Sequence, residues 1–106
     1  MSGLAVVLTT AGSEVEASRI ARSLVETRLA ACVNVLPGVA STYWWQGSVN
    51  TEDEWLLVIK TRADRFEEVR AAIRTLHSYE APEVVMIEAS AVDPAYAAWL
   101  DASLKG

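Results

Sequence analysis

Cysteine and histidine are nearly absent from this sequence, which holds one of each, Cys32 and His77. A lone cysteine cannot form an intramolecular disulfide, so a secreted disulfide framework is excluded and a reducing cytoplasm is the expected compartment. A metal site built from imidazole and thiolate alone would have at most two ligands from one chain.

Positive charge and long apolar runs are also scarce. Nine basic residues stand against fourteen acidic ones, giving a net charge of −5, which disfavours nucleic acid and anionic membranes as partners. No apolar run is long enough to cross a bilayer, and the short run at the N-terminus follows no basic segment. We therefore expect a soluble cytoplasmic protein without signal peptide or membrane span.

The length of 106 residues predicts a single domain over residues 1–106. The β-branched run 4–10 predicts a strand, and the following helix should begin after Ser13 and end near Arg28. Ser13 and Glu16 have the spacing of a capping box, in which each side chain binds the backbone N–H of the other residue.

Residues 31–62 predict a long β-hairpin. Val, Thr and aromatic residues fill its first arm, Pro37-Gly38 predicts a bulge, and Gln46-Gly47 predicts the turn. The return arm is charged in its first half and apolar from Trp55 to Ile59.

Two more helices and one more strand complete the pattern. Asp64 and Glu67 predict a capping box for a helix that ends near His77, and residues 83–89 predict a strand. Asp93-Pro94 predicts the start of a last helix, whose expected buried face is Tyr96, Trp99, Leu100 and Leu104. The order predicts an α+β, ferredoxin-like βαββαβ fold with an extra C-terminal helix.

The hairpin is too long for its domain. Each arm of about fourteen residues would extend about 45 Å, whereas a domain of this size is about 34 Å across. Its end carries Tyr43, Trp44 and Trp45, and exposed aromatics on an overhanging strand favour self-association. The alternative is that these tryptophans fold back over the open face of the domain's own sheet.

Four segments in this order resemble the CutA family of divalent-cation-tolerance proteins: "VVLTTAGSEVEASRIA", "RLAACVNVLPGVASTYWWQGSV", "LLVIKTR" and "HSYEAPEVV". The resemblance covers nearly the whole chain. It implies a ferredoxin-like subunit in a tight homotrimer resembling the PII signalling proteins, with the long hairpins packed around a threefold axis. It also implies a cytoplasmic protein of the response to metal ions, linked to copper and other divalent ions, with no enzymatic reaction and no obligatory cofactor.

The motif of the family is H-P-Y-E-x-P-E, and this chain has Ser78 where proline is usual. Some relatives use a cysteine and a second histidine for copper, and the corresponding positions here resemble Thr9 and Leu76. The remaining candidate metal ligands are His77, Glu80 and Cys32, with Cu²⁺ or another divalent ion as the candidate ligand. His77 could instead cap a helix end, Cys32 could be a core residue, and Glu80 could be solvated.

The resemblance also implies crevices between subunits that bind a small ligand or a partner protein, by analogy with PII. The residues implied to line them are Trp45, Lys60, Tyr79 and Glu83. The residues expected at the trimer interface are Tyr43, Trp44, Trp45 and Trp55, which packing explains more simply than ligand binding.

Two hypotheses of function follow. The first is a trimeric protein that binds copper or another divalent metal, and the second is a trimeric signalling or scaffold module whose response to metal is indirect. An acylphosphatase, a Ser-His-Asp hydrolase and an RNA-binding domain are all disfavoured, because the glycine-rich phosphate loop, the nucleophile elbow and the basic strands that they require are missing.

Overall fold

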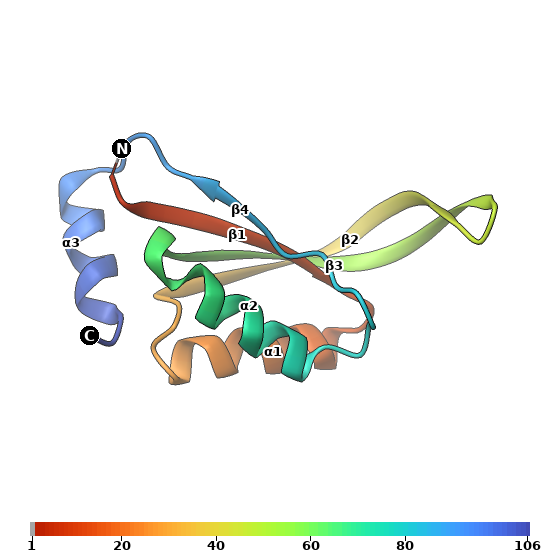
Figure 1. The fold of residues 1–106 in the computed structure, drawn as a ribbon, viewed down its shortest axis with the longest axis horizontal. Coiled ribbons are helices and arrows are strands. Elements are labelled where there is room, and N and C mark those ends of the chain that lie inside the picture. The colour runs from red at the N-terminus through yellow and green to blue at the C-terminus, as the bar shows by residue number, and fades with distance from the viewer. Residues whose placement is uncertain (1) are drawn as a thin grey trace.

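A computed structural model of the protein describes residues 2–106, which form one α+β domain (Figure 1). The elements, in order, are β1 (Leu4–Ala11), α1 (Glu14–Glu26), β2 (Cys32–Trp45), β3 (Ser48–Arg62), the 3-10 turn η1 (Ala63–Arg65), α2 (Phe66–Leu76), β4 (Val85–Glu88) and α3 (Pro94–Ser103). The predicted fold class is confirmed, and the predicted boundaries of β4 shrink to four residues.

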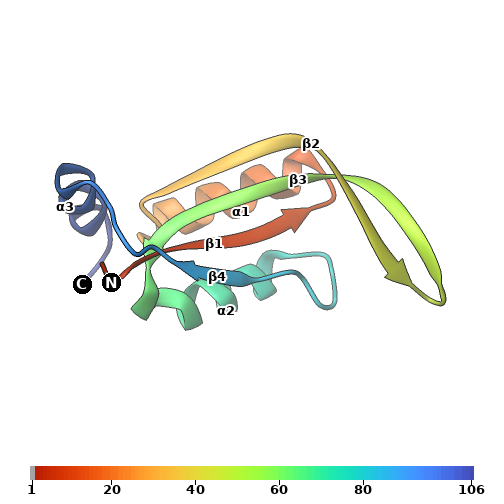
Figure 2. The same ribbon diagram turned by 90° about the horizontal axis from the view of Figure 1, so that it is seen from above.

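The four strands form one sheet in the order β2-β3-β1-β4, with all three pairings antiparallel. Helices α1 and α2 both cover the same face of this sheet, and α3 lies beyond its end, near the start of β1 (Figures 1 and 2). This is the ferredoxin-like arrangement with an added helix.

The core lies between the sheet and the two helices. Alternate residues of β1 and β3 point toward the helices, and Val7, Leu57 and Ile59 are completely buried there. They pack in one cluster with Ile20 from α1 and Ile73 from α2. The helical spacing of the apolar residues thus places both helices on this face.

The opposite side of the sheet is also apolar, and we call it the open sheet face. It is formed by the alternate strand residues that point away from α1 and α2, namely Val6, Leu8, Leu36, Leu56, Val58, Val85 and Ile87. Each of these side chains is half-buried or exposed. The protomer therefore leaves an apolar surface in contact with water, which is unusual for a monomeric protein.

The hairpin of β2 and β3 projects past the body of the domain (Figures 1 and 2). The molecule measures 45 × 26 × 23 Å, and the ribbon extends along its longest dimension (Figure 1). Gln46 and Gly47 both have positive φ, 49° and 80°, as a type I′ turn requires, and the expected bulge interrupts the register between Leu36 and Val39. Trp44 is 74% exposed and Trp45 is 60% exposed, so the alternative that they fold back over the sheet is wrong.

Of the three predicted helix caps, one is confirmed, one forms only in part and one is wrong. The Ser13 hydroxyl accepts a hydrogen bond from the Glu16 N–H at 3.2 Å, but the Glu16 carboxylate binds Ser78 and does not complete the capping box. The predicted cap at Asp64 is wrong, because this residue lies in η1 and its carboxylate binds Arg62. Asp93 caps α3 as expected, accepting from the N–H groups of Ala95 and Tyr96.

The predicted buried face of α3 is only half correct. Leu100 and Leu104 are buried against Leu4 and Ala31, but Tyr96 and Trp99 are exposed. Because α3 packs on the end of the sheet and not across a face, only a narrow stripe of the helix is covered. None of the helices within residues 2–106 has the length and apolar character needed to traverse a membrane.

Candidate functional site around His77

His77 lies at the end of α2, and its side chain is completely buried. Its ring Nε2 is 2.6 Å from the carbonyl oxygen of Thr10, and its Nδ1 accepts a hydrogen bond from the N–H of Tyr79 at 3.0 Å. Because a carbonyl can only accept, Nε2 carries a proton in the contact with Thr10, and Nδ1 also lies 3.3 Å from Oε1 of Glu16. Both ring nitrogens are thus engaged within the subunit.

Ser78 is bound to the start of α1. Its N–H and its hydroxyl both donate to the carboxylate of Glu16, at 2.5 and 2.9 Å. Burial raises the pKa of Glu16, but these two hydrogen bonds and the electrostatic effect of the neighbouring His77 and Arg19 together hold that pKa below its usual value. A proline at position 78 has no N–H and could make neither bond.

Tyr79 connects the same segment to the hairpin. Its ring lies 4.5 Å from that of His77, and its hydroxyl donates to the Glu54 carboxylate on β3 at 2.8 Å. Burial and the negative charge of Glu54 raise the pKa of Tyr79 to about 12. Gly12 allows this approach, since a Cβ there would lie 3.0 Å from the tyrosine oxygen.

The three predicted metal ligands do not gather in one subunit. In the sheet, Cys32 pairs with Lys60 of β3, which pairs in turn with Val6 of β1. His77 contacts Thr10, which lies four residues further along β1, roughly 13 Å from Val6. Glu80 is exposed in the loop after α2. Residues 2–106 contain no group of three or more His, Cys, Asp or Glu side chains that could hold a metal ion. The donors of one protomer therefore do not fit a copper site, and ligation across subunits stays a prediction.

The predicted crevice residues are also separated within one chain. Trp45 pairs with Ser48, and Lys60 lies twelve residues further along β3, roughly 40 Å along the strand. Lys60 binds the side-chain oxygen of Asn34, while Glu83 is exposed. A crevice that contains both Trp45 and Lys60 needs more than one copy of the chain.

The predicted interface residues divide into two groups. Trp44, Trp45 and Tyr43 are exposed on the hairpin, where the Tyr43 hydroxyl donates to Glu52. Trp55 instead packs against the core of its own subunit. The interface role of all four stays a prediction.

Sequence reasoning missed Glu16, Glu54 and Gly12 as partners of the motif. The position of Glu16, third in α1, predicted a hydrogen bond near the N-terminus of the helix, but the capping-box spacing predicted Ser13 as its partner. Nothing in the local sequence indicates that Glu54 or Gly12 lies beside Tyr79.

The sequence matches the family model for the CutA1 divalent ion tolerance protein over residues 5–103. This chain belongs to the CutA1 family. The divalent-cation tolerance protein CutA of Thermus thermophilus is 44% identical over 95 residues, which cover 90% of this chain and 92% of that protein. The protein of the same name from Pectobacterium atrosepticum is 39% identical over 100 residues, covering 94% of this chain and 91% of that protein.

Solved structures of CutA1 relatives have the same fold. The divalent cation tolerance protein from Thermus thermophilus superposes with a TM-score of 0.93 at 41% identity, covering 96% of this chain and 99% of that chain. CutA from Xylella fastidiosa superposes with a TM-score of 0.94 at 36% identity, covering 97% of this chain and 99% of that one. The extended hairpin and the added C-terminal helix are therefore family features.

Proposed function

We propose that this CutA1-family chain acts in divalent-cation tolerance as a cytoplasmic, non-enzymatic homotrimer, whose inter-subunit crevices bind a small ligand or a partner protein. One observation carries the proposal: the open sheet face and the exposed tryptophans of the hairpin are apolar surfaces that the protomer leaves uncovered. Burial of such surface releases roughly 25 cal/mol per Å², which favours association.

The position of the crevice residues supports the same proposal. Trp45 lies at the tip of the hairpin and Lys60 lies near its other end, so only assembly can bring an indole from one copy beside a lysine of another. Tyr79 is 39% exposed and is held by Glu54 at the base of the hairpin, where an added subunit would form the second wall of a crevice.

Light scattering on purified protein tests the assembly. The wild type should have three times the mass of one chain, and Ile87→Glu should lower the mass toward a monomer. Ile87 lies on the open sheet face and is 54% exposed, so a carboxylate there is tolerated in the protomer but not in a buried interface.

Val15→Glu is the matched control. Val15 is 75% exposed on α1, away from the open sheet face, so the same change should leave the mass of a trimer. A wild type that is monomeric at micromolar concentration, or an Ile87→Glu variant that stays trimeric, would sink the proposal.

Direct copper binding is the second candidate function. The observation that favours it is the pair of exposed carboxylates, Glu80 and Glu83, in the loop after His77, where several copies could contribute ligands together. Calorimetric titration with Cu²⁺ should compare the wild type with His77→Ala and with Glu80→Gln. The second variant is needed because His77 is also a buried structural residue.

Glu14→Gln is the control for Glu80→Gln, since Glu14 is an exposed carboxylate on α1. Identical isotherms for the wild type, His77→Ala and Glu80→Gln would discard this candidate. A loss of affinity in Glu80→Gln but not in Glu14→Gln would instead favour it over the indirect response.

A further inference from the structure

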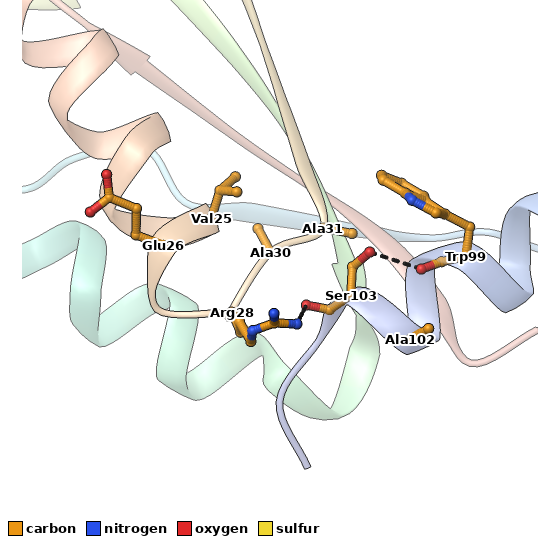
Figure 3. Close-up of a pocket in the computed structure, with 8 residues that line it drawn as sticks. All are labelled: Val25, Glu26, Arg28, Ala30, Ala31, Trp99, Ala102 and Ser103. Atoms are coloured by element: carbon orange, nitrogen blue, oxygen red, sulfur yellow. Dashed lines mark hydrogen bonds between the residues drawn. The ribbon is translucent and has the colours of Figure 1, made fainter.

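A hollow of about 430 Å³ lies between the end of α1, the turn into β2, and α3 (Figure 3). Its residues come from three separate segments: Val25, Glu26 and Arg28, then Ala30 and Ala31, and Trp99 with Ala102 and Ser103. The volume is in the range of small-molecule sites, roughly 300–1,000 Å³. The hollow is at the opposite end of the sheet from the projecting hairpin (Figure 1).

Arg28 occupies a backbone position where glycine is the usual residue. The N–H of Arg28 donates to Val25 O, and the N–H of Leu29 donates to Leu24 O, both at 3.0 Å, which is the Schellman pattern at a helix C-terminus. The φ of Arg28 is 60°, in the left-handed region that is unfavourable for any residue with a Cβ. Glycine would suit this backbone better, so any advantage of arginine at this position comes from its side chain.

The guanidinium of Arg28 reaches α3 through one hydrogen bond, which its Nη1 donates to the carbonyl oxygen of Ser103 at 3.3 Å. The backbone carbonyl of Arg28 accepts a second bond from the N–H of Lys105 at 3.1 Å, which joins the same two segments. Among the described residues, no second acceptor binds this guanidinium, which leaves most of its five N–H groups available. The hydrogen bond to Ser103 satisfies one carbonyl group at the end of α3, but it does not neutralise the positive charge of Arg28.

Most of the other wall residues are apolar. Trp99 is 48% exposed, because it lies outside the buried stripe of α3. Its indole lies on the wall of the hollow that is farther from Arg28 (Figure 3). Val25, Ala30 and Ala102 supply small apolar side chains between them. Together they offer a surface on which a planar ring can pack.

One carboxylate stands near the rim, and it does not neutralise Arg28. Glu26 is paired with Arg22 at 3.2 Å, and its carboxylate points away from Arg28 (Figure 3). The fork of a single guanidinium fits one carboxylate group.

We propose that this hollow is a binding site for a small planar monocarboxylate, such as an aromatic or heteroaromatic acid. Arg28 binds the carboxylate of this ligand and Trp99 packs on its ring. None of the proposed crevice residues lines this hollow, although Ala31 in its wall donates its N–H to the carbonyl oxygen of Lys60 at 2.9 Å.

Indole-3-acetate is the probe, and the indole N–H signal of Trp99 in NMR spectra of labelled protein is the readout. We expect a saturable shift of this signal, which Trp99→Phe identifies. Arg28→Gln should weaken binding roughly tenfold or more, because a hydrogen bond between two charged groups is lost. Indole-3-acetamide, which lacks the charge, should bind more weakly by a similar factor.

Arg74→Gln is the matched control, since it removes the same charge from an exposed position on α2 and should leave the affinity unchanged. Arg28→Gly guards against misfolding, because glycine suits the positive φ, and it should lose the probe in the same way. Equal affinity in all variants, equal affinity for acid and amide, or no shift of the Trp99 signal at millimolar probe would overturn the proposal. A change of oligomeric mass in Arg28→Gln together with no probe binding would do the same, since the hollow would then belong to a subunit contact.

Discussion

Replacement of Ser78 tests whether the contact with Glu16 stabilises the junction of α2 and α1. Ser78→Ala removes the hydroxyl bond, at 2.9 Å, and keeps the N–H bond, at 2.5 Å. A hydrogen bond to a charged acceptor contributes roughly 1.5–3 kcal/mol, but Ser78 is exposed and water can replace part of it. We expect Ser78→Ala to lower the free energy of unfolding by about 1 kcal/mol.

Ser78→Pro restores the usual residue of the family motif and should cost more. His77 already has φ −82° and ψ 141°, the extended conformation that a residue before proline adopts, so the backbone leading into position 78 tolerates the ring. Both hydrogen bonds are lost. Proline also lowers the conformational entropy of the unfolded chain, which offsets about 0.4–1 kcal/mol of the lost stability. The expected net loss is about 2 kcal/mol.

The effect should depend on pH through Glu16. Its pKa in the folded state lies below the usual value of 4.5, so the stabilisation is fully present above that value. It is lost as the pH falls through the lower, folded-state pKa. The difference in stability between the wild type and Glu16→Gln should therefore be largest near neutral pH and shrink below about pH 4.5.

Urea unfolding at one fixed protein concentration is the assay, because association shifts apparent stability. Ser90→Ala, at an exposed serine in the segment after β4, is the control and should match the wild type. Equal stability of wild type and Ser78→Ala at neutral pH, or a Ser78→Pro variant more stable than the wild type, would refute the reasoning.

Three further predictions concern the same region. Thr9 is completely buried and its hydroxyl has no partner among the described residues, so Thr9→Val should raise the free energy of unfolding by about 1 kcal/mol in urea titrations, and a loss would contradict this. Ultraviolet titration should show an ionisation near pH 12 that is absent in Tyr79→Phe. Because the pKa of Tyr79 is raised, the stabilisation it gives is present below pH 10 and is lost between about pH 10 and 12, and a Tyr79 that ionises near pH 10 would argue against this. Gly12→Ala should lower the pKa of Tyr79 toward 10, because the added methyl group would lie 3.0 Å from the tyrosine oxygen and displace it. The same substitution in a Tyr79→Phe background should lower the free energy of unfolding much less, and equal losses in both backgrounds would refute the contact.

The elements that could be predicted are those with a local cause. Gln46-Gly47 fixes the turn, because both residues adopt positive φ there. The length of the two arms then requires the ribbon to project beyond the body, whatever the details of packing. Asp93-Pro94 fixes the start of α3 in the same way, since cap and helix opener are adjacent in the chain.

The candidate site depends on contacts that are far apart in sequence, and these were not predictable. Glu16 had the spacing to complete a capping box with Ser13, yet its carboxylate binds Ser78, which offers two donors from a distant segment. Asp64 likewise prefers the guanidinium of Arg62 to a helix N–H. In each case a charged or doubled hydrogen bond outcompetes the single local bond that the spacing suggested.

The burial of Trp99 was mispredicted for a different reason. Helical spacing shows which residues share a side of α3, but the width of the covered stripe depends on what the helix packs against. Because α3 meets the end of the sheet, Leu100 and Leu104 fill the contact and Trp99 is left on the wall of a hollow.

The motif that carries the family resemblance has a structural role that must be separated from any role in metal response. His77, Ser78 and Tyr79 bind β1, α1 and β3 in turn, through Thr10, Glu16 and Glu54. A substitution of His77 removes two buried hydrogen bonds at the point where the hairpin leaves the body. Loss of copper binding in a His77 variant would therefore not identify a ligand, because a displaced Tyr79 or a weakening of the proposed trimer predicts the same loss. An exposed residue of the same loop, such as Glu80, gives the evidence that His77 cannot.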